Sequence, residues 1–507
     1  MISAVELFLI SVGLTYYLAT TGTGMVLVHR SGWAGRHRHR RGHPPCPAAP
    51  DVPAHRRVRP PPHQRLWRLL VTPEAPPPRA SIVESPADLV TYFLVPCLNE
   101  ELVIGHTVRG LLGDSRAEVI VIDDGSDDAT GEVAAAVDPD RVRVVRRELP
   151  NARLGKGPAL NTGFAAILHD AAIRGIAVSR IIVCVMDADG ELSHGSLYEV
   201  LPLFSDARVG GVQLPVRIRN AHSLLTMLQD LEFWGVAAVG QIGRNVTGTV
   251  SLGGNGQFTR LTALLELGRE PWRPRLTEDL DLGVALSVAG WRLLSTPRAY
   301  VTQQGVPSFR ALIRQRTRWY QGHLEAAEWL GKLWSSSRVS HLGMIEITLY
   351  LMIPWVLVLP WSVLMNYNLA MAAGWWLGWA PGPQIGATPI ERIASISGWY
   401  LMSFLPLWSA GYLYHKQRRG SLLLSLLLGN LLLFGNYIAF LACWLGFFRH
   451  LKGSRGWAKT SRVSERGGAI RPAVPVADSA PALIGGVPGV APAAALAPLP
   501  ATGAESQ

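Results

Sequence analysis

The 507-residue sequence predicts an α/β domain with a mostly parallel sheet, set between segments that are long and apolar enough to cross a membrane. In the middle of the chain, short apolar runs alternate with helical patterns, as expected where strands and helices alternate. Uncharged apolar runs stand on both sides of this region. Charged residues make up only 17% of the chain, against about 25% in ordinary soluble proteins. This composition excludes a mainly disordered chain and suggests that part of it lies in lipid.

The first element in order is an N-terminal transmembrane helix over residues 2–28. Glu6 is the only charged residue there, and about 20 apolar residues suffice to span a bilayer as a helix. A signal peptide is the competing interpretation, but its basic residues would precede the apolar run, whereas here they follow it. Basic residues flanking a span favour the cytoplasmic side, so we expect the segment after the helix to be cytoplasmic.

A basic, proline-rich linker is expected over residues 29–86. Between His29 and Thr72 there are ten Arg and one Asp, with many prolines. Proline lacks the N–H group that helices and strands use, which favours an extended tether. A uniformly basic protein would suggest nucleic acid. A basic block beside an apolar run instead favours the anionic face of a membrane, so we expect no nucleic-acid partner.

The α/β domain is predicted over residues 87–335. Strands are expected at 90–95, 118–122, 142–145 and 180–186, and helices at 100–112 and 158–173. Ligands of such sheets lie at the carboxyl ends of the strands, where this sequence has polar clusters. The amphipathic stretches 223–242 and 309–334 fit either helices at a membrane surface or ordinary surface helices.

The C-terminal transmembrane region is predicted over residues 342–448, with about three spans. Apolar runs at 342–373, 393–413 and 421–448 each exceed the length needed to cross. Three spans would put the basic residues 449–466 outside, which the charge rule disfavours. Either one segment is re-entrant or 342–379 crosses twice. The tail, 449–507, is basic and then rich in Ala and Pro, which predicts disorder.

Carboxylates and one lysine follow the predicted strands. Asp123 and Asp124 end one strand, and burying two acids is costly unless they bind something. Asp187 and Asp189 follow another strand, and a spacing of two would put them on one side. Such a pair suits a hard divalent cation whose coordination is completed by phosphate. Lys156, in a glycine-flanked turn, suits a phosphate.

Two further motifs stand downstream. Thr277-Glu278-Asp279 opens a predicted helix, which by itself is explained by an N-cap and acids in the first turn. Gln315-Arg316-Thr317-Arg318-Trp319 by itself fits a surface helix. Each motif alone is weak evidence for a function. Their order within one α/β domain flanked by apolar spans is much stronger evidence.

Together these motifs resemble those of the membrane-integrated family 2 glycosyltransferases, the group of cellulose, hyaluronan, chitin and poly-N-acetylglucosamine synthases. The matching pieces cover roughly residues 90–322. They are Val95 to Glu100, Asp123 to Gly125, Gly155 to Gly157, Asp187 to Asp189, Thr277 to Asp279 and Gln315 to Trp319. The resemblance implies a nucleotide-sugar-binding domain of the GT-A-like fold on the cytoplasmic side of a multi-pass cell-membrane protein.

The resemblance also implies roles for individual residues. A nucleotide-sugar donor, UDP-glucose or UDP-N-acetylglucosamine, would be bound by Pro96, Glu100, Asp123, Asp124, Lys156, Asp187 and Arg318. Asp189, with Asp187, would bind Mg²⁺ or Mn²⁺ on the diphosphate. Asp279, next to Glu278, would be the catalytic base that takes the proton of the acceptor hydroxyl. Trp319 and Gln315 would contact the acceptor.

Three functions remain open from the sequence. The first is an inverting enzyme that extends a growing β-linked glycan and exports it across the bilayer, with any export partner unidentified. The alternative is a non-processive transferase that adds one sugar to a lipid carrier. A catalytically silent membrane scaffold is the third, and the presence of all the expected carboxylates argues against it. Relatives often carry two adjacent basic residues after a Gly-rich strand, but Leu252 to Arg260 has one Arg, so the acceptor stays open.

Overall fold

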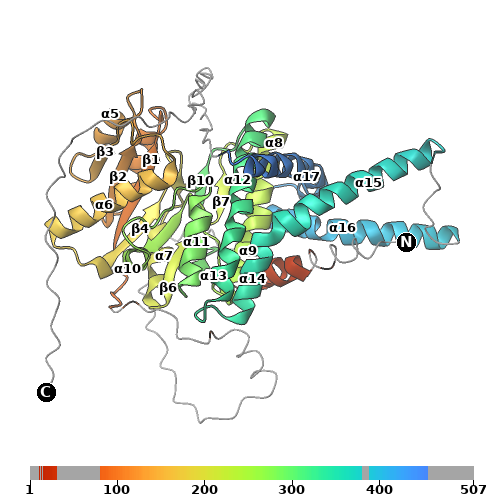
Figure 1. Ribbon diagram of the computed structural model, residues 1–507, viewed down its shortest axis with the longest axis horizontal. Helices are drawn as coiled ribbons and strands as arrows, with labels where there is room; N and C mark the ends of the chain where they lie inside the picture. The colour runs from red at the N-terminus through yellow and green to blue at the C-terminus, as the bar shows by residue number, and fades with distance from the viewer. Residues whose placement is uncertain are drawn as a thin grey trace, which may run out of the picture. The chain divides into compact units, whose positions relative to one another are not determined.

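The computed structural model describes residues 11, 13, 15–30, 73, 80, 82–379, 388–418 and 420–454 (Figure 1). The predicted linker lies almost wholly outside the described residues, as do most of the C-terminal tail and the start of the N-terminal helix. Within the described part of that helix lie η1 (Leu18–Gly22) and α2 (Thr23–Arg30).

A seven-stranded sheet forms the centre of the α/β domain, in the order β3-β2-β1-β4-β8-β6-β9. Its strands are β1 (Val90–Cys97), β2 (Ala117–Asp123), β3 (Val142–Arg146), β4 (Ile181–Val185), β6 (Val209–Gln213), β8 (Gln257–Arg260) and β9 (Arg292–Ser295). All pairs are parallel except those of β8, which runs antiparallel to β4 and β6. The four predicted strands and the mostly parallel sheet are confirmed.

Helices cover both faces of this sheet, because alternate residues of a strand point to opposite sides. Phe93 and Val95 of β1 join a core under α4 (Ile104–Leu111), α5 (Thr130–Ala135) and α7 (Ser196–Val200). Tyr92 and Leu94 join a second core under α6 (Lys156–Arg174), α10 (Leu261–Glu266) and α11 (Glu278–Val288). A three-stranded sheet, β5 (Glu191–Leu192), β10 (Val301–Gln303) and β7 (Val216–Ile218), lies beyond the carboxyl end of β4.

The two amphipathic stretches form segmented helices that connect the α/β domain to the apolar helices. The first consists of α8 (Leu224–Asp230), the π-helix η4 (Leu231–Ala237) and α9 (Ala238–Gly243), which η5 (Arg244–Val246) continues. The second consists of α12 (Phe309–Glu325), η6 (Ala326–Trp329) and α13 (Leu330–Trp334). α9 packs against α2, η4 against α16, and α12 against α17. Both stretches are therefore sandwiched between the domain and the apolar helices.

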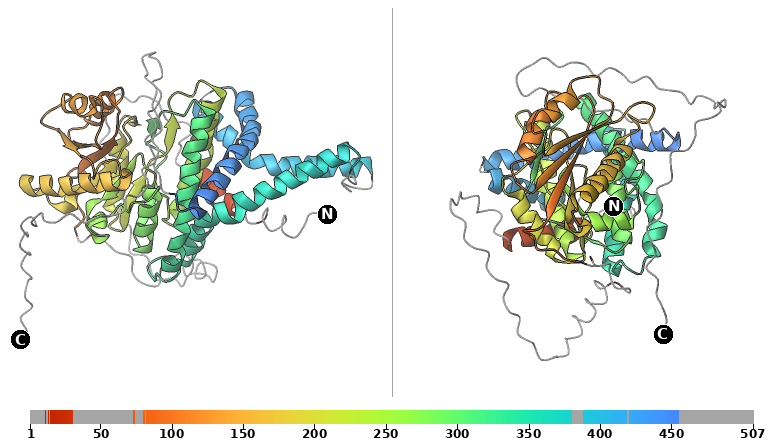
Figure 2. Two further views of the ribbon diagram at one scale, coloured as in Figure 1. Left: turned by 45° about the horizontal axis from the view of Figure 1, so that its top comes forward. Right: turned by 90° about the vertical axis from the view of Figure 1, so that its left-hand side faces the viewer.

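The C-terminal helices lie on the side of α12 that faces away from the sheet (Figures 1 and 2). They are α14 (His341–Met352), η7 (Ile353–Val358), α15 (Leu359–Trp376), α16 (Pro389–Arg418) and α17 (Leu422–Leu451). Among the described residues, two helical segments are long and apolar enough to cross a membrane, His341–Trp376 and Leu422–Leu451. His341–Trp376 is one continuous helical segment, which argues against a double crossing there. α16 occupies the second predicted span but is not among the two.

Candidate active site

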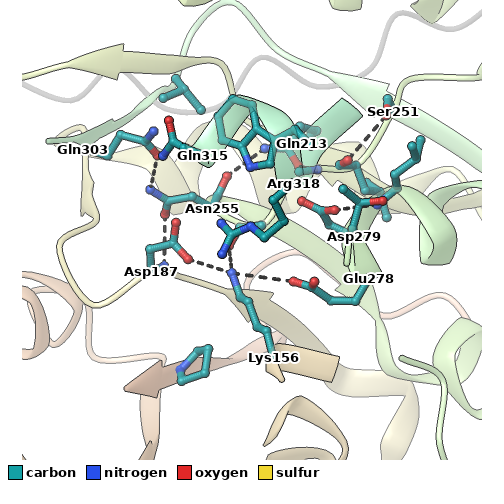
Figure 3. A pocket seen from close by; sticks show the side chains of 18 of the residues that line it. Lys156, Asp187, Gln213, Ser251, Asn255, Glu278, Asp279, Gln303, Gln315 and Arg318 are labelled. Atoms are coloured by element: carbon teal, nitrogen blue, oxygen red, sulfur yellow. Dashed lines mark hydrogen bonds and ion pairs between the residues drawn. The ribbon is translucent and has the colours of Figure 1, made fainter. Parts of the chain in front are cut away.

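A cavity of about 440 Å³ opens at the carboxyl ends of β1, β2 and β4. Most of the residues singled out in the sequence line it: Pro96, Glu100, Asp124, Lys156, Asp187, Glu278, Asp279, Gln315, Arg318 and Trp319. Asp123 and Asp189 do not. Parallel strands end at one edge of the sheet, so residues far apart in the sequence meet there. Figure 3 shows several of these side chains pointing toward one another.

Lys156 lines this cavity and is the first residue of α6. Its Nζ lies 2.6 Å from Asp187 Oδ1, 2.7 Å from the Gly254 carbonyl oxygen and 3.9 Å from Glu278 Oε1 (Figure 3). Burial alone would lower the pKa of Lys156, but the charges of Asp187 and Glu278 outweigh it and raise the pKa. The lysine is therefore a fixed positive charge among carboxylates. Gly155 before it has φ +114°, a conformation that favours glycine.

Asp187 and Asp189 occupy different environments. Asp187 lines the cavity, whereas Asp189 is fully buried and its Oδ2 accepts a hydrogen bond from the Gln304 backbone N–H at 2.9 Å. We expected both carboxylates on one side because of strand geometry. β4 ends at Val185, so both residues lie in the following turn and the spacing of two no longer sets their direction.

Asp123 and Asp124 differ in the same way. Asp124 lines the cavity and forms an ion pair with Arg147, in which both side chains are buried. Burial is the main cause that raises the pKa of Asp124. Asp123 instead stabilises the turn: it accepts from the Ser126 N–H at 2.8 Å and pairs with Arg146 at 2.6 Å. Of the two acids, only Asp124 is therefore placed to contact a ligand in the cavity.

Glu278 and Asp279 stand at the start of α11. Burial, followed by the charge of Asp279, raises the pKa of Glu278 to about 7. The pKa of Asp279 is raised as well, mainly by burial. A carboxylate with a raised pKa accepts protons more readily near neutral pH, as a general base requires. Thr277 makes no side-chain capping bond, unlike the N-cap that the sequence suggested.

α12 presents a row of side chains to the cavity at helical spacing. Gln315, Arg318 and Trp319 line it, and so does His323, one turn beyond Trp319. Nε2 of His323 lies 2.8 Å from the carbonyl oxygen of Tyr350, and burial lowers its pKa to about 4. The imidazole is therefore neutral. His323 was not predicted from the sequence, although its spacing of four residues from Trp319 places both side chains on one face of a helix.

Other lining residues carried no recognisable signal. Amide side chains of Gln213, Asn255 and Gln303 form part of the wall, and Asn255 Nδ2 donates to Gln303 Oε1 at 3.0 Å (Figure 3). Arg260, the single basic residue near the predicted acceptor strand, is buried elsewhere and donates to the Phe204 carbonyl oxygen at 2.6 Å. Arg260 therefore contributes nothing to the lining.

The chain is similar in sequence to several known proteins. Residues 86–322 match the family model described as "Glycosyltransferase like family 2". A beta-monoglucosyldiacylglycerol synthase of Synechocystis sp. is 33% identical over 285 residues, 53% of this chain and 56% of the relative. A poly-beta-1,6-N-acetyl-D-glucosamine synthase of Staphylococcus aureus is 28% identical over 238 residues, 45% of this chain and 53% of the relative.

Among solved structures, a mannosyltransferase of Pyrobaculum calidifontis is 16% identical and covers 88% of this chain and 99% of its own, with a TM-score of 0.45. The chain spans about half the length of the curated relatives it matches. The family match covers β1 to β10 and most of α12, and thus the motifs that line the cavity. Residues 86–322, which include most of the residues that line the cavity, are therefore similar to the family 2 glycosyltransferases.

Proposed function

We propose that this protein transfers a sugar from a nucleotide-sugar donor to the hydroxyl group of a membrane-presented acceptor, with inversion at the anomeric carbon. The observation that carries the proposal is the position of Lys156, whose Nζ lies between Asp187 and Glu278 in one cavity. This arrangement brings a phosphate-binding cation beside buried carboxylates of raised pKa. Those are the two groups that glycosyl transfer from a diphosphate needs: charge stabilisation on the leaving group and a base for the acceptor.

The donor would lie along the strand ends. Asp124, with Pro96 and Glu100 beside it, would bind the nucleoside, and UDP-glucose or UDP-N-acetylglucosamine is the proposed donor. Lys156 and Arg318 would hold the diphosphate, because a lysine supplies a point charge and a guanidinium supplies a planar fork of donors. Asp123 supports this end indirectly, through the turn that carries Asp124.

The residues present fit a divalent cation shared with the donor. Asp187 offers carboxylate oxygen at the cavity wall, the ligand type that Mg²⁺ and Mn²⁺ prefer. Within the described ranges, no three His, Cys, Asp or Glu residues form a metal site, so the diphosphate would complete the coordination. Asp189 would join Asp187 only if its turn rearranged. The bound cation would neutralise charge on the leaving diphosphate.

Asp279 would accept the proton of the attacking hydroxyl, with Glu278 shaping its electrostatic environment. The acceptor oxygen would approach the anomeric carbon from the side opposite the leaving diphosphate, which inverts the configuration and gives a β linkage. Trp319 would offer a flat face to the acceptor sugar, and Gln315 a hydrogen-bonding amide.

The far wall of the cavity supports a membrane-presented acceptor. It is formed by residues of η4, α12 and α14, and η4 and α12 pack against α16 and α17. Relatives named as glucosyldiacylglycerol synthases support a lipid acceptor, and the relative named as a poly-N-acetylglucosamine synthase supports a growing β-glycan. In either case the protein would be a multi-pass cell-membrane enzyme with its catalytic domain in the cytoplasm.

The test is a transfer assay on the full chain in lipid nanodiscs, with radiolabelled UDP-glucose and UDP-N-acetylglucosamine as donors. Label that partitions into organic solvent identifies a lipid product, and label retained as high-molecular-mass material identifies a polymer. Asp279→Asn serves as the inactive control. Absence of both transfer and donor hydrolysis with every donor would overturn the proposal.

A further inference from the structure

We infer that Arg316, held by Glu232, is a positioning residue that fixes the indole of Trp319 at the acceptor end of the cavity. The inference rests on the proposed function, because it assigns Trp319 to acceptor binding. Arg316 itself does not line the cavity. It acts through the ring of Trp319, three residues further along the same helix.

The guanidinium of Arg316 contacts one carboxylate and two aromatic rings. Its Nη2 lies 2.8 Å from Glu232 Oε2, and its Cζ lies over two rings, 4.4 Å from the centroid of Trp319 and 5.4 Å from that of Phe233. The two rings meet edge to face, with centroids 6.1 Å apart and an interplanar angle of 83°. One guanidinium thus joins both aromatic rings and a carboxylate.

The burial of these groups distinguishes the pair from an ordinary surface ion pair. The side chain of Arg316 is only 12% exposed, whereas that of Glu232 is 45% exposed. A guanidinium withdrawn from water interacts more strongly with an aromatic face than an exposed one. The carboxylate prevents the guanidinium from leaving the ring, and the guanidinium orients the indole that lines the cavity.

The opposite wall supplies Glu232 and Phe233 as consecutive residues of the π-helix η4. π-helical turns occur frequently at functional sites, because the extra residue redirects neighbouring side chains. Here Glu232 forms the ion pair with the guanidinium, and Phe233 both contacts the guanidinium and lines the cavity beside Trp319. Arg316, Glu232, Phe233 and Trp319 together form a clamp that joins α12 to η4 at the acceptor end of the cavity. This clamp sets the distance between the two cavity walls.

Residues of the motif Gln315 to Trp319 therefore have different roles. Gln315, Arg318 and Trp319 line the cavity, whereas Arg316 lies behind the Trp319 and Phe233 rings and sets the angle of the tryptophan. A sugar that stacks on an indole needs the ring in one orientation before it arrives, since ordering it afterwards would cost binding energy. Loss of Arg316 should therefore weaken acceptor use and spare the donor site.

The experiment compares Arg316→Met, Arg316→Lys and Glu232→Gln with wild type, on the full chain in nanodiscs. The readouts are the acceptor KM, kcat, donor hydrolysis to water and UDP binding by calorimetry. We expect Arg316→Met to raise the acceptor KM about tenfold, since small misplacements of substrate-orienting groups are costly. Donor hydrolysis and UDP binding should change less than about twofold. Arg314→Met, at an exposed position on the same helix, is the matched control and should behave as wild type.

Arg316→Lys and the double variant Glu232→Gln/Arg316→Met test whether the contacts of Arg316 cause the effect. Arg316→Lys keeps the ion pair but not the planar stacking, so it should be intermediate, and it decides the question if Arg316→Met does not fold. The double variant Glu232→Gln/Arg316→Met should have an acceptor KM no higher than that of Arg316→Met alone, because both substitutions remove the same ion pair. Equal loss of transfer and hydrolysis with an unchanged acceptor KM would overturn the inference. A wild type that transfers to no acceptor would instead overturn the proposed function.

Discussion

Gly322 of α12 lies directly against Thr277, the residue that precedes Glu278 and Asp279. A Cβ atom at position 322 would stand 2.4 Å from Thr277 Oγ1 and 2.6 Å from its Cγ2. Real Cβ atoms essentially never approach other atoms that closely, so glycine lets α12 pack against the N-cap residue of α11, the helix that carries the proposed base. The helix with Arg318 and Trp319 and the start of α11 are thus held at one fixed separation.

Gly322→Ala should therefore lower activity although Gly322 is not among the residues that line the cavity. The added methyl group must push Thr277 or α12 aside, and overpacking of this kind typically costs about 1–3 kcal/mol of stability. We expect a lower melting temperature and lower transfer activity, measured on the purified protein. Gly331→Ala is the matched control, since a Cβ at position 331 meets nothing within 4 Å. Equal behaviour of the two variants would contradict the packing argument.

Asp279→Asn should abolish transfer while sparing the donor site. The amide keeps the shape of the carboxylate but cannot take a proton, and loss of a general base typically costs about 10²–10⁴-fold in rate. UDP affinity, measured by calorimetry, should stay close to wild type. Glu278→Gln should retain more activity than Asp279→Asn. If the order of these two variants were reversed, Glu278 would be the base.

The pH dependence follows from the raised pKa of Asp279. A base works only when deprotonated, so kcat should fall as the pH drops through the pKa of the base. Because the pKa of Asp279 is raised, this fall should occur at a higher pH than for an ordinary Asp. Lys156 lowers the pKa of Asp279, so Lys156→Gln should move the fall to still higher pH. The measurement is kcat against pH at saturating donor. An unchanged profile, or a shift to lower pH, would show that Asp279 does not control the reaction.

The sequence predicted four of the seven strands of the main sheet, because the signal for these strands is local. The four predicted strands, β1 to β4, are short apolar runs, and polar clusters follow β2 and β4, so the parallel arrangement and the common edge follow from general rules. The strands β6, β8 and β9 are less apolar and were not among those predicted. Lys156, Asp187 and the Glu278–Asp279 pair meet as expected. Their proposed roles stay predictions.

What the sequence could not predict depends on tertiary packing. The burial of Asp123 and Asp189 depends on where a strand ends and which backbone N–H lies opposite, and neither is encoded nearby. Gln213 and Arg147 reach the cavity region from separate elements without a motif. Phe233 lies there because of the π-helix η4, which departs from the regular helical period that sequence patterns detect.

Asp187 and Asp189 should respond differently to metal, because only Asp187 lines the cavity. Asp187→Asn should weaken UDP binding in the presence of Mn²⁺ and have little effect after chelation. Asp189→Asn weakens the hydrogen-bond acceptor of the Gln304 backbone N–H. This variant should therefore lower the melting temperature, both with and without metal. Calorimetry and thermal denaturation, each with and without chelator, separate the two. UDP binding by wild type that is indifferent to chelation would refute the metal site.

Gly446 of α17 should matter for catalysis although it lies on the opposite side of α12 from the cavity. A Cβ there would stand 2.9 Å from the Gln321 backbone nitrogen and 3.0 Å from the Thr317 carbonyl oxygen. Backbone atoms cannot rotate away, so Gly446→Ala must displace α12, whose Trp319 lies within one turn of both contacts. We expect a loss of transfer larger than the loss of UDP binding, since the acceptor end moves most. Gly435→Ala on the same helix is the control, because its Cβ would meet only Leu432 at an ordinary 3.7 Å. Normal acceptor KM and kcat in Gly446→Ala would show that α17 does not set the position of the motif helix.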